Sequence, residues 1–246
     1  MQYLRPEDTI HKSYLNRLLI EIVDNPILSS NLAFKGGTCA QMLRFLDRFS
    51  VDLDFDVITM TDESKLRNEF RNIFNHLGLT MIKESTPALF FQLKYASETG
   101  KRSAIKTSAS IIKIKTNEYK IQYLSEIDRL ANCQTIETMF ANKLVALIDR
   151  WEKNNSIAGR DLYDIHYFFL SGHRYNKDVI IERRKNKDLK FFFQELINFI
   201  QKEITETIIN QDINMLLPPQ KFQKIRKILK QETLMFLNDE IKRLSK

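Results

Sequence analysis

The stretch Phe34–Asp56 constrains this chain more than any other, because it combines a glycine pair with acids that alternate along an apolar run. Gly36 and Gly37 stand near its start, and Asp52 and Asp54 flank a single leucine near its end. Acids at positions i and i+2 of a β-strand project from the same face, while their apolar neighbours point into a core. The pattern predicts a strand–turn–helix–strand unit with a polar site on one face of a sheet.

The two carboxylates form a candidate metal site. Two like charges that converge to roughly 4–5 Å repel by about 3–4 kcal/mol at an effective dielectric near 20. A divalent cation between them removes that cost, and carboxylate oxygens are ligands that suit Mg²⁺. We therefore predict that Asp52 and Asp54 bind Mg²⁺.

The glycine pair forms a candidate phosphate site beside them. Glycine tolerates positive φ and lets the backbone approach a ligand closely. A helix that starts near Thr38 would offer free N–H groups to phosphate oxygens. Lys35 precedes the pair, whereas a Walker loop would place its lysine after the glycines. We predict that nucleotide binding involves Lys35, Gly36, Gly37 and Thr38.

Composition limits the classes of protein that fit. The 246 residues are 43% hydrophobic, enough for one large domain or two small ones. The net charge of +7 favours a polyanionic partner such as nucleotide or RNA. Cys39 and Cys133 provide neither a disulfide framework nor zinc spacing, which suits a reducing compartment. The N-terminus does not resemble a signal peptide, and no apolar run approaches a membrane span, so we expect a cytoplasmic protein.

Apolar periodicity predicts a fold of the α+β class, with a mixed sheet, flanking helices and a C-terminal helical domain. We place the first domain at residues 1–124 and the helical domain at 125–246. His11, in the first helix, is expected at the surface. The predicted helices cover about 8–24, 38–47, 62–77, 136–151, 188–209 and 219–244, with another opening at 160. The predicted strands are 32–35, 51–57, 90–95, 104–115 and 119–123, with a hairpin turn at 97–101.

Two polar features of the helical half stand out. Lys143 shares a helix face with Leu147 and Arg150, although a lysine that extends to solvent would explain it as well. Asp161 and Asp164 lie one turn apart where a helix opens, a position at which acids ordinarily cap. The basic run at residues 183–187 is interpreted as a solvated connector in preference to an RNA contact.

These motifs resemble the nucleotidyltransferase toxins of the AbiEii/AbiGii family, the toxin halves of bacterial abortive-infection (phage-defence) and toxin–antitoxin pairs. Four separated pieces, spanning roughly residues 30–170, carry the resemblance. They are Lys35-Gly36-Gly37-Thr38, then Arg48-x-Ser50-x-Asp52-Leu53-Asp54-Phe55, then Lys143, and finally Arg160-Asp161-x-x-Asp164.

The resemblance implies a nucleotidyltransferase fold whose active site the helical domain completes. It implies an NTP on the glycine turn, Mg²⁺ on the acid pair, and an RNA acceptor, with the tRNA 3′ end as the leading candidate. A cognate antitoxin is the implied protein partner. The roles it suggests are triphosphate contact for Lys143 and a base or acceptor-orienting role for Asp161. Asp164 could bind nucleotide, cap the helix or hold Arg160, and Ser50 could support the acids. Arg44 or Arg48 could contact phosphate, and an ion pair with a nearby aspartate explains Arg48 equally well.

One departure from the wider fold keeps other functions open. Nucleotidyltransferases often carry a third carboxylate on a later strand, but residues 104–112 contain no acid and offer Lys106, Thr107, Ser108 and Ser110 instead. One alternative is a transferase that modifies a small molecule, or a kinase-like enzyme that moves the γ-phosphate. The other is a catalytically degenerate module that only binds nucleotide.

Overall fold

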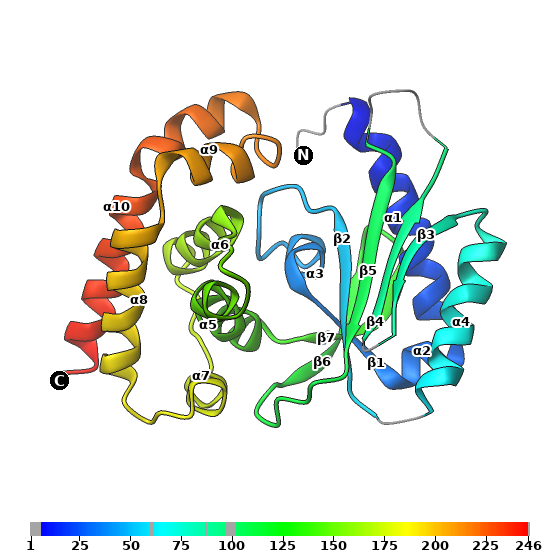
Figure 1. Cartoon of the computed structure of the whole chain (residues 1–246), viewed down its shortest axis with the longest axis horizontal. Helices are drawn as coiled ribbons and strands as arrows, with labels where there is room; N and C mark the ends of the chain where they lie inside the picture. Colours follow the sequence, from blue (N-terminus) through cyan, green and yellow to red (C-terminus); the bar gives the residue numbers. More distant parts are fainter. Residues whose placement is uncertain (1–5, 60–61, 87, 97–101, 246) are drawn as a thin grey trace. The chain divides into compact units, whose positions relative to one another are not determined.

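A computed structural model of the chain describes residues 6–59, 62–86, 88–96 and 102–245 (Figure 1). The chain divides into two compact units. The first comprises Met1–Lys113 and Tyr119–Thr135, and the second comprises Ile114–Glu118 and Ile136–Lys246. The boundary predicted after residue 124 therefore falls inside the sheet of the first unit, which continues to residue 135.

The first unit is built on a seven-stranded mixed sheet with the order β3-β4-β5-β2-β1-β7-β6. The central strand β2 pairs in parallel with β5 and antiparallel with β1, and β1 pairs in parallel with β7. This mixed sheet with flanking helices confirms the predicted fold class. The strands are β1 (Leu32–Lys35), β2 (Asp52–Val57), β3 (Thr80–Ser85), β4 (Leu89–Lys94), β5 (Ala104–Ser110), β6 (Tyr119–Leu124) and β7 (Arg129–Gln134).

Helices cover the two faces of this sheet unequally. One face packs against α1 (Pro6–Asp24), α2 (Pro26–Asn31) and α4 (Glu63–His76), as Figure 1 shows. The short helix α3 (Gly36–Met42) packs on β2 and β1 from the other face. The alternation of side chains along β2 explains why helices pack mainly on one face of the sheet. Leu53 and Phe55 are buried on that face, while the aspartates that alternate with them point to the other face.

Several elements differ from the predictions. The helix expected at 38–47 begins at Gly36 and ends at Met42. The Asn25–Pro26 break also starts α2, because the Asn25 side chain accepts hydrogen bonds from the Ile27 and Leu28 N–H groups at 2.9 and 3.0 Å. Strands β3 and β7 were not anticipated, and the hairpin turn predicted at 97–101 lies outside the described residues.

The second unit is helical. Its helix α5 (Ile136–Asn154) packs against α6 (Gly159–Leu170) and α7 (Lys177–Arg184), and α10 (Pro219–Arg243) packs against α6 and α8 (Leu189–Glu203). The helix expected at 188–209 is divided, because α8 ends at Glu203 and Thr205 caps a separate helix, α9 (Glu206–Ile213). The described part of the chain contains no helix with the length and apolar character needed to cross a membrane.

His11 is buried, so the prediction of a surface histidine is wrong. Its Nδ1 lies 3.0 Å from the Tyr95 hydroxyl and its Nε2 lies 2.9 Å from the Val51 carbonyl oxygen. Burial lowers the pKa of His11 to about 4, although the bond to Val51 opposes that shift. The neutral ring thus ties α1 to the residue that precedes β2.

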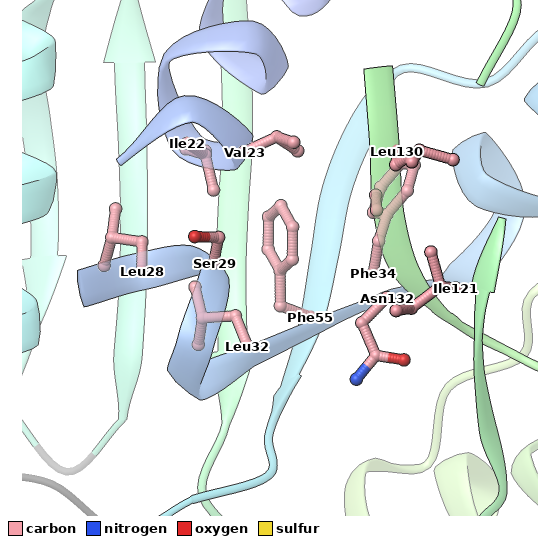
Figure 2. A pocket seen from close by; sticks show the side chains of 11 residues that line it. Ile22, Val23, Leu28, Ser29, Leu32, Phe34, Phe55, Ile121, Leu130 and Asn132 are labelled. Atoms are coloured by element: carbon pink, nitrogen blue, oxygen red, sulfur yellow. The ribbon is translucent and has the colours of Figure 1, made fainter. Parts of the chain in front are cut away.

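A pocket of about 260 Å³ lies on the helical side of the first unit (Figure 2). Its lining comes from α1, α2, β1, β2 and the β6–β7 pair and is mostly apolar, with Ser29 and Asn132 as the polar members. Phe34 and Phe55 reach into it from the central strands. A lining of this kind offers few polar partners to a triphosphate, so this pocket does not suit the phosphate site that the sequence predicts.

Candidate active site

Strand β2 presents three aspartates on one face of the sheet. Asp52, Asp54 and Asp56 alternate with buried apolar residues, and the first two are only partly buried whereas Asp56 is 4% exposed. The face opposite the packed helices therefore carries a short row of carboxylates, as the sequence predicted for Asp52 and Asp54. The third acid extends the same alternation but has different surroundings.

Asp54 is held on both sides. The Ser108 hydroxyl donates a hydrogen bond to Asp54 Oδ1 at 2.7 Å, across the parallel β2–β5 pair in which these two residues are register partners. On the other side a Cβ added to Gly36 would lie 2.9 Å from Asp54 Oδ2. Gly36 also has φ +81°, a conformation that favours glycine, so this glycine serves both the turn and the close approach of the carboxylate.

Asp56 is tied into the sheet. Its carboxylate forms an ion pair with Lys35 and accepts hydrogen bonds from the Tyr119 hydroxyl at 3.0 Å and the Gln134 amide at 2.6 Å. These partners satisfy a buried charge that would otherwise be costly. They also occupy the Lys35 ammonium, which the sequence predicted to bind phosphate. The β1–β2 pairing explains the contact, because Lys35 lies beside Asp54 in register and next to Asp56 on the same face.

The second glycine makes room for a different pair of side chains. A Cβ on Gly37 would lie 2.7 Å from Arg48 Nη2 and 2.9 Å from Ser50 Oγ. The Thr38 hydroxyl, in the first turn of α3, donates a hydrogen bond to the Asp52 carbonyl oxygen and lies 3.0 Å from Ser50 Oγ, within hydrogen-bonding distance. These contacts join the turn to the residues that lead into β2, so the predicted turn and acid residues form one connected cluster in the first unit. Arg44, with φ 62°, is exposed.

The second unit brings together the other predicted residues. Lys143 Nζ on α5 lies 2.6 Å from Asp161 Oδ1 and 2.9 Å from Asp164 Oδ2, both buried on α6. Arg150 adds a second cation 3.0 Å from Asp161 Oδ2. Lys143 is thus ion-paired and not a lysine that merely extends to solvent. Burial raises the pKa of Asp161, but the charges of Lys143 and Arg150 outweigh it and lower that pKa to about 2.

The basic cluster at residues 183–187 is structural where it is helical. Arg183 and Arg184 end α7, and each lies within 3.0 Å of Asp149 on α5. Arg184 also pairs with Glu152 and Glu195. Their charges are neutralised inside the second unit, so the interpretation as a solvated connector is wrong for Arg183 and Arg184. It fits residues 185–187, which link α7 to α8 and carry two exposed lysines.

No group of three or more histidine, cysteine or acidic side chains in the described ranges is arranged to hold a metal ion. The acid pair on β2 nevertheless suits Mg²⁺, because this ion keeps several waters and is commonly bound by one or two carboxylates together with substrate phosphates. Asp52 and Asp54 are both partly exposed, and Ser108 fixes Asp54 Oδ1 by a hydrogen bond.

Sequence reasoning missed three residues of these clusters. Asp56 continues the alternation of the acids, so its position on the same sheet face as Asp52 and Asp54 could be predicted from the sequence. Its ion pair with Lys35 could not, because Lys35 lies on a neighbouring strand. Ser108 was visible only as a non-acidic residue, and its contact with Asp54 follows from the β2–β5 register. Arg150 shares a face with Lys143, yet its carboxylate partner lies on another helix.

Comparison with known proteins identifies the family of the chain and solved structures with a similar fold. The family model described as nucleotidyl transferase AbiEii toxin, type IV TA system, matches residues 17–233. A candidate nucleotidyltransferase from H. pylori has a crystal structure similar to this fold, with a TM-score of 0.61 and 21% identity over 98% of both chains. JHP933 from Helicobacter pylori is similar with a TM-score of 0.54 and 19% identity, covering 99% of this chain and 98% of that one. Comparison with curated proteins gives no match.

Proposed function

Because the chain belongs to the AbiEii nucleotidyl transferase toxin family of type IV toxin–antitoxin systems, we propose that it transfers a nucleoside monophosphate from an NTP to a hydroxyl group of RNA. The family makes the protein a nucleotidyltransferase and a toxin and implies an antitoxin partner. The RNA acceptor, with the tRNA 3′ end as the leading candidate, is the proposed part. The observation that supports it most is the Asp52–Asp54 pair beside the Gly36–Gly37 turn.

The proposed reaction is a displacement at the α-phosphorus of the NTP. The acceptor hydroxyl oxygen forms the new P–O bond, the bond between the α-phosphorus and the bridging oxygen to the β-phosphorus breaks, and pyrophosphate leaves. The hydroxyl proton passes to solvent or to a carboxylate on the reactive face. Most of the catalysis in such a reaction is positioning and charge stabilisation.

The acid pair and the turn divide the positioning between them. Asp52 and Asp54 would hold Mg²⁺, which when bound neutralises charge on the phosphates. Gly36, Gly37 and Thr38 would approach the phosphates with the backbone, since the glycines present no side chain there. Ser50 and Ser108 would orient this cluster through their bonds to Thr38 and Asp54.

We also propose a part in this reaction for Lys143, which lies on α5 in the second unit. We assign Lys143 to triphosphate oxygens, as a compact charge that can exchange one anionic partner for another. Asp161, with a pKa near 2 and almost full burial, is a poor proton acceptor, so we assign it to orient Lys143. Asp164 shares that role through its own contact with Lys143.

Transfer from α-labelled NTPs to total tRNA in the presence of Mg²⁺ tests the proposal. The wild type is expected to label tRNA and Asp54→Asn to label none. Asp62→Asn is the matched control, because Asp62 caps α4 away from the site and asparagine caps helices equally well.

Other outcomes would replace the proposal with a stated alternative. Label that moves only from the γ-phosphate, to a protein or a small molecule, would identify a kinase-like enzyme. An α-labelled small molecule in place of tRNA would identify a small-molecule nucleotidyltransferase. Bound nucleotide with no transfer of either label would identify a binding module.

A further inference from the structure

The carboxylate face of the sheet continues from β2 across β5, β4 and β3. Strand register aligns its residues in rows across the sheet. One row runs from Asp52 through Lys106 and Gln92 to Lys83. The next runs from Asp54 through Ser108 and Phe90 to Ser85. Neighbouring strands lie about 4.8 Å apart, so these rows lead directly away from the proposed reaction centre.

Burial alternates sharply on β4 and β5. Leu89, Phe91, Leu93, Ile105 and Ala109 are at most 1% exposed and belong to the face packed by helices. The intervening residues are exposed or half-buried, so the face that continues from the aspartates is open to solvent there. Figure 1 shows α4 along the packed side of these strands.

The open face is basic. Lys83, Lys94 and Lys106 are all exposed, and Phe90 and Gln92 lie between them. We call these five residues the basic sheet face. Within the ranges that the structure describes, no carboxylate forms an ion pair with any of its three lysines. They differ in this from Arg183 and Arg184, whose charges are neutralised.

We propose that the basic sheet face binds the single-stranded end of the acceptor RNA. Exposed lysines attract backbone phosphates, and an aromatic side chain on an open sheet offers a surface on which a base can stack. The proposal rests on the proposed function, since it gives the RNA acceptor a place on the enzyme. The proposal goes beyond that function by assigning RNA binding to residues outside the Gly36–Gly37 turn and the Asp52–Asp54 pair.

Topology gives the two substrates separate sides of β2. The Gly36–Gly37 turn follows β1, which pairs with one edge of β2, and Lys106 and Ser108 lie on β5, which pairs with the other edge. NTP on the turn and RNA on the basic sheet face would therefore meet above Asp52 and Asp54. An approach from opposite sides suits the in-line arrangement of attacking and leaving oxygens in phosphoryl transfer.

Binding of a short fluorescent single-stranded RNA, without NTP or Mg²⁺, tests the face directly. The variant replaces Lys83 and Lys106 with glutamine, and the control makes the same replacement at Lys65 on α4 and at Lys120 on β6, the strand at the opposite edge of the sheet from β3. Both pairs are exposed, and both double variants lower the net charge from +7 by two, to +5. The face variant is expected to bind about tenfold more weakly, with a salt dependence reduced by about 1.4 in log–log slope.

Phe90→Leu tests base stacking separately, because leucine keeps an apolar side chain at that position and removes the ring. We expect binding about fivefold to a hundredfold weaker from the loss of one stacked base. In the transfer assay, both the lysine variant and Phe90→Leu should raise the KM for RNA and leave the KM for NTP unchanged.

Equal binding by the face variant and the control would overturn the proposal, because RNA affinity would then follow net charge alone. A raised KM for NTP with RNA binding unchanged would overturn it as well, and would assign the lysines to the triphosphate. If the face variant bound RNA as the wild type does but no longer bound an acidic protein partner, the basic sheet face would be a protein interface. A selective loss of RNA binding would support the face even if no nucleotide transfer occurred, in which case only the proposed function would fail.

Discussion

At the scale of single residues, the position of Asp54 depends on a hydroxyl group from the neighbouring strand. Removing Ser108 leaves Asp54 Oδ1 without its 2.7 Å partner. A hydrogen bond to a charged group contributes about 1.5–3 kcal/mol, so Ser108→Ala should lower kcat/KM about tenfold or more and raise the Mg²⁺ concentration needed for activity. Ser108→Thr should restore both. Ser110→Ala on the same face of β5 is the control, and equal losses in the two alanine variants would contradict this role.

Gly36 and Gly78, two of the three described glycines with positive φ, allow the effect of backbone strain to be measured separately from that of steric conflict. A Cβ at Gly36 meets Asp54 Oδ2 at 2.9 Å, whereas a Cβ at Gly78 has no atom within 4 Å. Both alanine variants should lose about 1–2 kcal/mol of unfolding free energy in the left-handed region. Only Gly36→Ala should also lose activity, by about a hundredfold, because it displaces a site carboxylate. Urea unfolding and the transfer assay measure the two effects, and full activity in Gly36→Ala would refute the steric argument.

The buried His11 makes stability depend on pH. Its pKa is about 4 in the folded protein, below the ordinary value of 6.5, so the unfolded chain binds the proton more readily. Its contribution is present above pH 6.5 and is lost as pH falls toward 4. Between pH 7 and pH 5 the unfolding free energy should fall by about 2 kcal/mol from this group. Urea unfolding at the two pH values checks this, and His11→Gln should remove that part of the dependence. An unchanged pH profile in the variant would exclude the histidine as its source.

At the scale of helices and strands, α5 and α6 are joined by charge. Lys143 forms ion pairs with both Asp161 and Asp164, and Asp164 is fully buried. Lys143→Met would leave buried carboxylates without this cation, a change that costs about 3–5 kcal/mol. Adding Asp164→Asn to this variant should recover part of the lost unfolding free energy but should not restore activity. Urea unfolding of the single and double variants measures the coupling. A Lys143→Met protein as stable as the wild type would show that the pairing contributes nothing.

Elements were predictable from sequence where one periodicity extended over the whole element. The strand–turn–helix–strand unit around Gly36 and Asp52 followed from glycine and alternating acids, and α5 and α10 followed from their apolar stripes. Strands β3 and β7 were missed for a physical reason. Exposed Met81 and Ile82 interrupt alternation in β3, beside a register shift at residues 81–83. In β7 the exposed Leu130 lies next to the buried Ala131, so hydrophobicity does not mark the faces.

The site was predictable to the same extent. The acid pair, the glycine turn and the lysine and aspartates of the helical half are local motifs, and each could be located by residue number. Their partners were not predictable, because Ser108, Gln134 and Tyr119 reach β2 residues only through strand pairings distant in sequence. Nothing in the local sequence around Ser108 distinguishes it from Ser110. The sheet register does so, by pairing Ser108 with Asp54 and Ser110 with Asp56.

At the scale of the whole molecule, the two units are not consecutive halves of the sequence, because each of them is built from two separate segments of the chain. It leaves the first unit after Lys113, contributes Ile114–Glu118 to the second, and returns for β6 and β7. Hydrogen bonds hold the inserted segment within the second unit. Asn142 Nδ2 donates to Asn117 Oδ1 at 3.0 Å, and the Glu118 N–H donates to Thr138 Oγ1 at 3.1 Å. A short segment therefore gives the second unit two stretches of chain.

Glu182 on α7 also holds this segment, and its removal provides a test. Its carboxylate accepts three hydrogen bonds, from the Lys115 and Thr116 N–H groups at 2.8 Å each and from the Thr116 hydroxyl at 2.7 Å. Glu182→Ala should lower the unfolding free energy by about 1–3 kcal/mol and speed hydrogen exchange at those two amides. Glu137→Ala, at an exposed first-turn position of α5, should cost less than about 1 kcal/mol. Exchange at residues 115 and 116 that is as slow in Glu182→Ala as in the wild type would show that this carboxylate does not anchor the segment. Other bonds, such as those to Asn142, Thr138 and Asn176, would then hold it.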